Sequence, residues 1–412
     1  MNIDISMLAS FDLGATPGVD DSIFEPLRSE EQARSLARRG MVPVEQPMPE
    51  GLSMNIGEGV TYDLTGTGLT ETLTAEARRI MADERKGDDR VAPRSIRVTL
   101  FPLGVAYLQV DLQPHAYADP GTALDVYQAY EYAAYGDFSN KLQSLMIDLL
   151  GQINRDDRLC RLTDRHDLAK VAPFDLIPGF TVLLVASRDH PRLDAFLDVF
   201  SRYERQYPYR EMELDDGRVF LGWASTVFVP RAEERDRLEW LLKTCLVYHG
   251  VCAAFEKVFR NHMIKAARSQ FTQGSAAYDI PALHRLQILA SSIPLLTDFH
   301  SSTNNISDLC LFDHFNFFAR IDKMHERIRS SSAIFSKTQT GLLRKVEEDR
   351  ASKINNFIFF LTGFTFISVV ADIINTTTSA NRLLPDPLVR LLLLTAPPLL
   401  LMFFIWKRFL SR

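Results

Sequence analysis

Alternating apolar and polar positions predict strands in the first part of the chain. SIRVTLF (95–101) and VAYLQVDLQ (105–113) both alternate, and the PLG between them is a turn sequence, so the pair predicts a β-hairpin. GFTVLLVASRD (179–189) and RVFLGWASTVFV (218–229) are longer apolar runs, and we interpret each as one buried strand.

Helical patterns at 121–152 and 191–206 lie between these strands. Strands and helices therefore mix up to about residue 230, which predicts an α/β (α+β) domain. Residues 1–60 are rich in glycine, proline and acidic residues, and we expect an irregular acidic N-terminal arm there. The α/β domain, with a helical second half, is then expected over 61–300.

After Pro230 the pattern becomes helical, with helices predicted over 233–267 and 279–299. From Asp308 the pattern stays helical, and no proline interrupts it until Pro385. Along this segment apolar residues recur at spacings of three, four and seven; they are Ile321, Met324, Ile328, Ile334, Phe335, Leu342 and Val346. We therefore expect a stalk helix over 301–353 that packs against other helices, about 70 Å long from Asp308 onward at about 1.5 Å per residue.

The C-terminal region, 354–412, contains two apolar runs. Residues 356–375 carry one charged residue, Asp372, and residues 388–406 carry one, Arg390. Each run is long enough to cross a bilayer core about 30 Å thick. A buried core helix would explain one such run, but two in tandem, joined by a short polar loop, predict a membrane hairpin.

The basic residues around these runs predict their orientation. Arg344, Lys345, Arg350 and Lys353 precede the first run, and Lys407 and Arg408 close the second. The connecting loop carries only Arg382 against Asp386. Under the positive-inside rule both termini are cytoplasmic and the loop lies outside. The N-terminus has no basic segment followed by a long apolar one, so we do not expect a signal peptide.

Polar residues of the first run fall on one side of a helix. At about 100° per residue they lie within an arc of about 120°; they are Asn355, Thr362, Thr365, Asp372, Thr376 and Ser379. This stripe could pack against another helix, with hydroxyls bonding across the interface. Alternatively, copies of the helix could surround a water-filled path, in which a ring of Asp372 carboxylates would favour cations. The second interpretation requires a closed oligomer.

Composition narrows the classes of function. The net charge of −6 argues against nucleic acid as the main partner, and a mean hydropathy of −0.06 indicates a chain that is mostly water-soluble. The four cysteines are scattered, which fits reduced thiols in a cytosolic compartment. Cys245, His249 and Cys252 could share a helix face, as could Cys310 and His314. A metal site and small buried residues both remain open for them.

The order of these parts resembles the plan of CorA-like divalent-cation (magnesium) channels and transporters. In that family the junction between stalk and first span reads N-x-x-M-x-x-L-T, and three of its four positions agree here, at Asn355, Leu361 and Thr362, with Ile358 in place of Met. The family's Gly-Met-Asn signature begins 24 residues after the Asn, where this chain has Ser-Ala-Asn at 379–381. The signature is therefore degenerate, with only Asn381 matching.

The resemblance implies a homopentamer whose first span lines a pore. Asn381 would lie at the outer mouth and, with Asp372, would meet the hydrated metal ion. The residues expected to line the pore, from the resemblance and the stripe together, are Asn355, Ile358, Leu361, Thr362, Thr365, Asp372, Thr376 and Ser379. The family also binds metal between its cytosolic domains, and the candidates for such sites here are Asp308, Asp313, Glu347, Glu348 and Asp349.

We therefore expect a CorA-like homopentameric channel for divalent cations, Mg²⁺ or a related ion, in a bacterial inner membrane. Its cytosolic domain would gate it, and it would use no cofactor and perform no covalent chemistry. Its expected partners are its own copies, the lipid bilayer and the cation, and not nucleic acid. The alternative is a CorA-like effector that a small ligand, such as a nucleotide messenger in phage defence, opens. A soluble enzyme anchored by a hairpin is a third hypothesis, for which no catalytic arrangement is found in the sequence.

Overall fold

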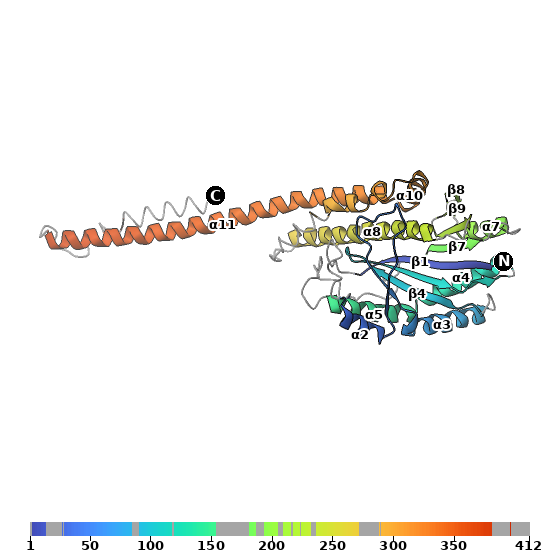
Figure 1. The fold of residues 1–412 in the computed structure, drawn as a ribbon. Helices are drawn as coiled ribbons and strands as arrows, with labels where there is room; N and C mark the ends of the chain where they lie inside the picture. The colour runs from blue at the N-terminus through green and yellow to red at the C-terminus, as the bar shows by residue number, and fades with distance from the viewer. Residues whose placement is uncertain are drawn as a thin grey trace. The chain divides into compact units, whose positions relative to one another are not determined.

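The computed structural model of this 412-residue chain describes residues 2–13, 27, 29–84, 90–117, 119–153, 181–186, 193–204, 209–215, 217–222, 224–231, 236–271, 288, 290–380 and 396. The chain divides into two compact units, Met1–Ile334 and Phe335–Arg412. The first unit is a mixed α/β structure built on one sheet, as the strand and helix patterns predict (Figure 1).

The sheet contains ten strands, almost all antiparallel. Only β7 and β10 pair in parallel among the described strands. In spatial order the strands are β2 (Val42–Val44), β3 (Val60–Asp63), β4 (Pro93–Leu100), β5 (Val105–Leu112), β1 (Asn2–Asp12), β7 (Thr181–Ala186), β10 (Ser225–Pro230), β9 (Gly217–Leu221) and β8 (Arg210–Leu214), and the short β6 (His115–Ala116) pairs with β1.

The predicted hairpin at 95–113 is confirmed as β4 and β5, which pair from Leu100 opposite Ala106 to Pro93 opposite Leu112. Gly104 has a φ of 75° in the connecting turn, a conformation that glycine adopts without steric cost. The single strand expected at 218–229 is instead two strands, β9 and β10, because Gly222 donates its N–H to the carbonyl of Ser225 and closes a tight turn. An apolar run cannot by itself show that two buried strands share it.

The irregular N-terminal arm expected at 1–60 is wrong. Residues 2–12 form β1, which lies between β5 and β7 in the sheet, and 30–37 form helix α2 (Glu30–Ala37). Ile3, Ile5 and Met7 alternate along β1 and are at most 1% exposed. The glycines, prolines and acidic residues that suggested an arm lie mainly after the strand, in 14–59.

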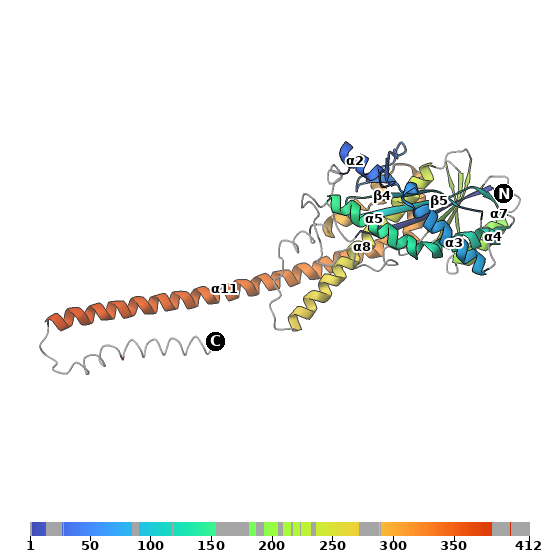
Figure 2. The ribbon, with the colours of Figure 1, turned by 90° about the horizontal axis from the view of Figure 1, so that it is seen from below.

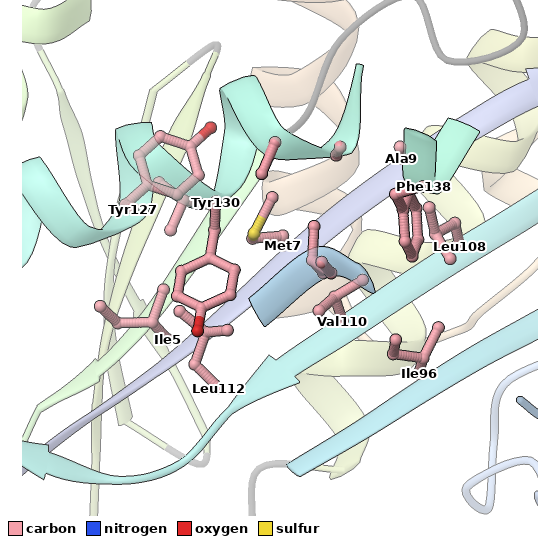
Figure 3. Packing of buried hydrophobic residues seen from close by; sticks show 14 of the residues in the cluster. Ile5, Met7, Ala9, Ile96, Leu108, Val110, Leu112, Tyr127, Tyr130 and Phe138 are labelled. Atoms are coloured by element: carbon pink, nitrogen blue, oxygen red, sulfur yellow. The ribbon is translucent and has the colours of Figure 1, made fainter. Parts of the chain in front are cut away.

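Helices cover both faces of the sheet (Figures 1 and 2). One face carries α3 (Leu69–Glu84), α4 (Pro120–Ala134), α5 (Asp137–Ile153) and α7 (Leu193–Glu204). Figure 3 shows the core on this side, where apolar residues of β1, β4 and β5 meet three aromatic side chains of α4 and α5, namely Tyr127, Tyr130 and Phe138. The phenol of Tyr130 donates to the Val91 carbonyl at 2.7 Å, so this buried polar group is satisfied.

The opposite face carries the helical second half of the unit. Its long helix α8 (Asp236–Phe271) contacts β1 and β5, and α10 (Ile306–Ala319) packs on α8. The 3₁₀ turn η5 (Phe299–Ser301) precedes α10. Residues 290–296 are helical as predicted for 279–299, and most of the remainder of that segment lies outside the described residues.

The continuous stalk helix expected over 301–353 is interrupted. Arg320 has a φ of 56° and ends α10, and α11 (Ile321–Ala380) begins directly after it. Asn316 stabilises this break, because its carbonyl accepts from the N–H of Arg320 at 2.7 Å and its side chain accepts from the N–H of Asp322 at 3.2 Å. Helix α11 is then unbroken for 60 residues, which corresponds to about 90 Å at about 1.5 Å per residue.

Candidate functional site

The first candidate site is the C-terminal part of α11. Within the part of the chain that the structure describes, one helical window, Arg350–Ile373, is long and apolar enough to cross a membrane, on length and composition alone. An 18-residue stretch within it has a mean hydropathy of 1.8, and 6% of that stretch is buried. A core helix of a soluble protein can meet the same test of length and composition, but it is mostly buried, whereas this window is not.

The apolar side chains of this window are exposed. Phe357, Phe360, Phe364 and Ile367 lie on the side of the helix opposite Asn355, and they are 65%, 61%, 72% and 52% exposed. Contiguous apolar surface of this kind marks a contact with a membrane or another protein. The window therefore requires an environment that the described residues of this chain do not supply.

The polar stripe lies on the same helix. Asn355, Thr362, Thr365 and Asp372 are all exposed side chains of α11. The hydroxyls of Thr362 and Thr365 donate to the carbonyls of Ile358 and Leu361, each at 2.7 Å. These two hydroxyls are thus satisfied by the backbone of their own helix, four residues earlier, and do not need a partner helix.

The remaining residues of the expected pore are only partly described. Ile358 and Leu361 are 54% and 52% exposed on α11. Thr376 and Ser379 belong to the helical backbone of α11, but their side chains lie outside the described residues, as does the whole of Asn381. The second expected span, 388–406, also lies outside them, apart from residue 396.

The first turns of α11 are anchored in the α/β unit. Ile321, Met324 and Ile328 are buried in the core cluster that α8 shares, which confirms the start of the predicted packing stripe. Arg327 forms an ion pair with Glu256 of α8 at 2.9 Å. Ile334, at the end of this unit, is 53% exposed, so the buried stripe does not continue to it.

Three side chains in contact, Cys252, Thr297 and His325, link α8 to the first turns of α11. The Thr297 hydroxyl lies 2.7 Å from Nε2 of His325 on α11 and 3.5 Å from the Cys252 sulfur on α8. Burial lowers the pKa of His325, because charging the ring without water is unfavourable. The neutral ring is therefore the form that this packing favours.

No group of three His, Cys, Asp or Glu side chains in the described residues could hold a metal ion, so Cys245, His249 and Cys252 do not form the site considered from the sequence. The candidates Asp308, Asp313, Glu347, Glu348 and Asp349 stay a prediction, because their sites would lie between copies of the chain. Asp308 is buried and paired with Arg237, and it also accepts from the Thr303 hydroxyl at 2.9 Å. It therefore ties the start of α10 to the start of α8. Burial raises the pKa of Cys252 to about 12 and that of Cys245 well above its usual value, so both thiols stay protonated.

The second candidate site is a charged layer buried between the sheet and α8, which we call the polar layer: Ser6, Ser95, Arg97, Tyr107, Gln109, Asp111, Glu239 and Lys243. Asp111 is at its centre and is 1% exposed. Its carboxylate accepts from the Ser6 and Ser95 hydroxyls at 2.7 Å each and from Arg97 at 2.6 Å. Burial alone would raise the pKa of Asp111, but Arg97 and these donors lower it to about 2, so the group is ionised at neutral pH.

Lys243 of α8 lies at the edge of the polar layer and is 2% exposed. Its ammonium is 4.1 Å from the centre of the Trp240 ring and 5.6 Å from those of Phe101 and Tyr107, within the range of cation–π attraction. Its Nζ donates to the Gln46 side chain at 3.0 Å. Burial, aided by the Arg97 charge, lowers the pKa of Lys243 to about 7, although Glu58 and Glu239 act in the opposite direction. A lysine that titrates near neutral pH is typical of functional sites.

A cavity of about 700 Å³ adjoins this lysine through Gln46. It lies where the chain leaves β2 and where it enters β3, and its lining includes Glu45, Gln46 and Glu58. The connection between β2 and β3 is hydrogen-bonded to the helical second half of the unit. The Ser53 N–H donates to the Ser302 carbonyl at 2.8 Å, and the Asn55 N–H donates to the Tyr248 phenol at 3.2 Å.

The sequence carried a weak signal for the polar layer. Arg97, Gln109 and Asp111 stand at alternate positions of the two hairpin strands, which is typical of a face in contact with water. Only the contact of this face with α8 shows that it is buried. No protein-family model, curated protein or solved structure matches the chain.

Proposed function

We propose that the protein is a CorA-like homopentameric channel for divalent cations, which the α/β unit gates. The observation that carries this proposal is α11 itself, an unbroken helix from Ile321 to Ala380. Its first turns are buried in the α/β unit, whereas its window at Arg350–Ile373 exposes apolar side chains suited to lipid. One helix would thus join the regulatory unit to the pore.

Cation selectivity follows from the polar stripe. A carboxylate within a span is costly, about 2.5–3.5 kcal/mol on insertion scales, so Asp372 would face protein or water rather than lipid. In a closed oligomer the stripe would surround a path, and five Asp372 carboxylates would attract cations. The threonine hydroxyls donate their hydrogens to their own helix, so their oxygens would be available as acceptors facing the path.

The residue roles follow the same scheme. Asn381 would form a ring at the outer mouth and bind the hydrated ion through amide oxygens, which suits Mg²⁺ because it gives up its water reluctantly. Asn355, Ile358 and Leu361 would line the inner part of the path. The protein would lie in a bacterial inner membrane with both termini in the cytoplasm, and ions would move down their electrochemical gradient.

Ion flux into proteoliposomes tests this proposal. The purified full chain would be reconstituted with a Mg²⁺-sensitive dye inside, with Co²⁺ and Ni²⁺ as comparison ions. We expect flux of at least one divalent ion, loss of its selectivity over anions in Asp372→Ala, and retention in Asp372→Glu, which keeps the carboxylate. Selectivity unchanged in Asp372→Ala would remove Asp372 from the path and overturn the role of the stripe.

The cavity favours a second candidate function, an effector pore that a small ligand opens. Its volume of about 700 Å³ is in the range of small-molecule sites, which are about 300–1,000 Å³. This candidate predicts an intact oligomer that conducts nothing until a ligand is added. The cavity does not favour a nucleotide messenger, however, because Glu45 and Glu58 in its lining would repel phosphate groups.

A further inference from the structure

The cavity beside β2 and β3 is lined by both apolar and polar side chains. Apolar side chains, among them Leu27, Val44 and Val60, form one part of the lining, and the polar side chains of Glu45, Gln46 and Glu58 form another. At about 700 Å³ it is far larger than a single hydrated ion needs, since a water molecule takes about 30 Å³ in the liquid. A site of this size with a mixed lining suits a small organic molecule.

The charge of the described lining is negative. Glu45 and Glu58 contribute carboxylates, and none of the described lining residues is a lysine or an arginine. The ammonium of Lys243 is 2% exposed and donates to the Gln46 oxygen at 3.0 Å, so it reaches the cavity lining only through Gln46. A positive group entering the cavity would therefore meet two carboxylates first.

The backbone that carries Glu58 is fixed. Gly59 has a φ of 76°, and a Cβ at this position would lie 2.4 Å from the carbonyl oxygen of Leu100 in β4. Only glycine fits such a close approach, which places Gly59 against the end of β4. Glu45 directly follows β2, so both carboxylates come from segments that the sheet positions. Rigid placement of this kind lowers the cost of ordering a binding site.

We propose that this cavity binds a small organic cation, with an apolar body against Val44 and Val60 and an amine or amidine group between Glu45 and Glu58. The ligand would also contact Gln46, whose side chain already bonds Lys243 of α8. Ligand binding would in this way affect Lys243 and, through it, the polar layer. The proposed site is independent of whether α11 forms a cation pore.

Three probes of one shape test the charge preference: 4-fluorobenzamidine, 4-fluorobenzamide and 4-fluorobenzoate, which differ in charge at neutral pH. The full chain in nanodiscs would be dialysed against each probe, with empty nanodiscs as the reference for lipid uptake, and the free probe would be measured by fluorine-19 NMR. We expect the amidine to bind at least tenfold more tightly than the neutral amide, and the benzoate to bind more weakly than the amide.

Variants locate the site. Glu45→Gln and Glu58→Gln should each weaken amidine binding at least threefold, since both side chains keep their shape and lose only their charge. Glu84→Gln, at the exposed end of α3 and outside the lining, removes one charge elsewhere and should leave binding unchanged. Equal binding of the three probes, tighter binding of the benzoate, or identical binding in the two cavity variants and wild type would each overturn the proposal. Because binding is measured without ion flux, its failure is separable from failure of the proposed channel.

Discussion

Charged side chains are usually exposed and large apolar ones buried, but the polar layer buries charge and the Arg350–Ile373 window exposes apolar side chains. In the polar layer a carboxylate, Asp111, is 1% exposed, whereas in the window an aromatic side chain, Phe364, is 72% exposed. The polar layer supplies partners for this carboxylate, because hydroxyls and a guanidinium surround Asp111. The window supplies none for its apolar surface. The buried charge of Asp111 is thus satisfied within one folded chain, whereas exposed apolar surface indicates a partner or a membrane.

The largest expected effect is in the polar layer. Asp111→Ala would leave Arg97 largely buried with no ion-pair partner, and breaking a buried pair in this way costs about 3–5 kcal/mol of unfolding free energy. Denaturant unfolding of the full chain in detergent, followed by circular dichroism, measures it. Asp83→Ala breaks the ion pair with Arg79 on the surface of α3 and should change nothing measurable. Similar midpoints for both variants would show that the polar layer is solvated rather than self-contained.

The next effect concerns the window. Phe364→Asp places a charge at an exposed apolar position, and insertion scales put its cost near the centre of a span at about 2.5–3.5 kcal/mol. We expect α11 to change from almost fully to mostly not inserted in a microsomal insertion assay with glycosylation sites on both flanks. Phe364→Leu keeps an apolar side chain and should insert like wild type. Poor insertion of wild type, or equal insertion of the Asp variant, would mean that protein and not lipid covers this face.

A smaller effect distinguishes Lys243 from an ordinary lysine. Its pKa is about 7 in the folded state, against 10.5 for a free side chain, so between these values the unfolded chain binds more protons. The free energy of unfolding should therefore rise with pH in this interval, by up to about 1.4 kcal/mol per pH unit, and Lys243→Met should lack this rise. Lys141→Met, an exposed lysine, is the matched control.

Fluorescence gives a direct reading of the same titration. With Trp223 and Trp406 replaced by Phe, the remaining Trp240 lies 4.1 Å from the ammonium and should report a midpoint near pH 7 that Lys243→Met abolishes. The charged groups that surround Lys243 are Arg97, Glu58 and Glu239, and Tyr107 faces it from the sheet. A midpoint near 10 would show that water reaches the amine.

Local patterns account for what the sequence could predict. The β4–β5 hairpin and α8 follow from alternation and helical periodicity over neighbouring residues. Strand β1 was missed although Ile3, Ile5 and Met7 alternate, because its partners β5 and β7 lie about 100 and 180 residues away. No glycine or proline near Arg320 marks the end of the helix in the sequence. The break becomes visible only in the structure, where Asn316 caps it.

The candidate sites divide along the same line. The polar stripe of α11 could be predicted because it depends only on the geometry of one helix. The polar layer and its cavity could not, because they depend on which helix covers the sheet. Ser6 lies in β1, Arg97 and Asp111 lie in the β4–β5 hairpin, and Lys243 lies in α8, and these segments are far apart in the sequence. They come together only through the pairing of β1, β4 and β5 and the packing of α8.

The smallest expected effect addresses the two interpretations of the stripe. If its threonines bond across a helix interface, Thr362→Val and Thr365→Val would each lose an interhelical hydrogen bond, worth about 0.6 kcal/mol on average in membrane proteins. In the structure both hydroxyls donate to their own helix, so we expect the double variant to keep the oligomeric state of wild type in native mass spectrometry at all detergent concentrations. A shift to smaller species in the double variant would mean that the stripe is an interface. Asp372 would then face a neighbouring helix and not a path for ions.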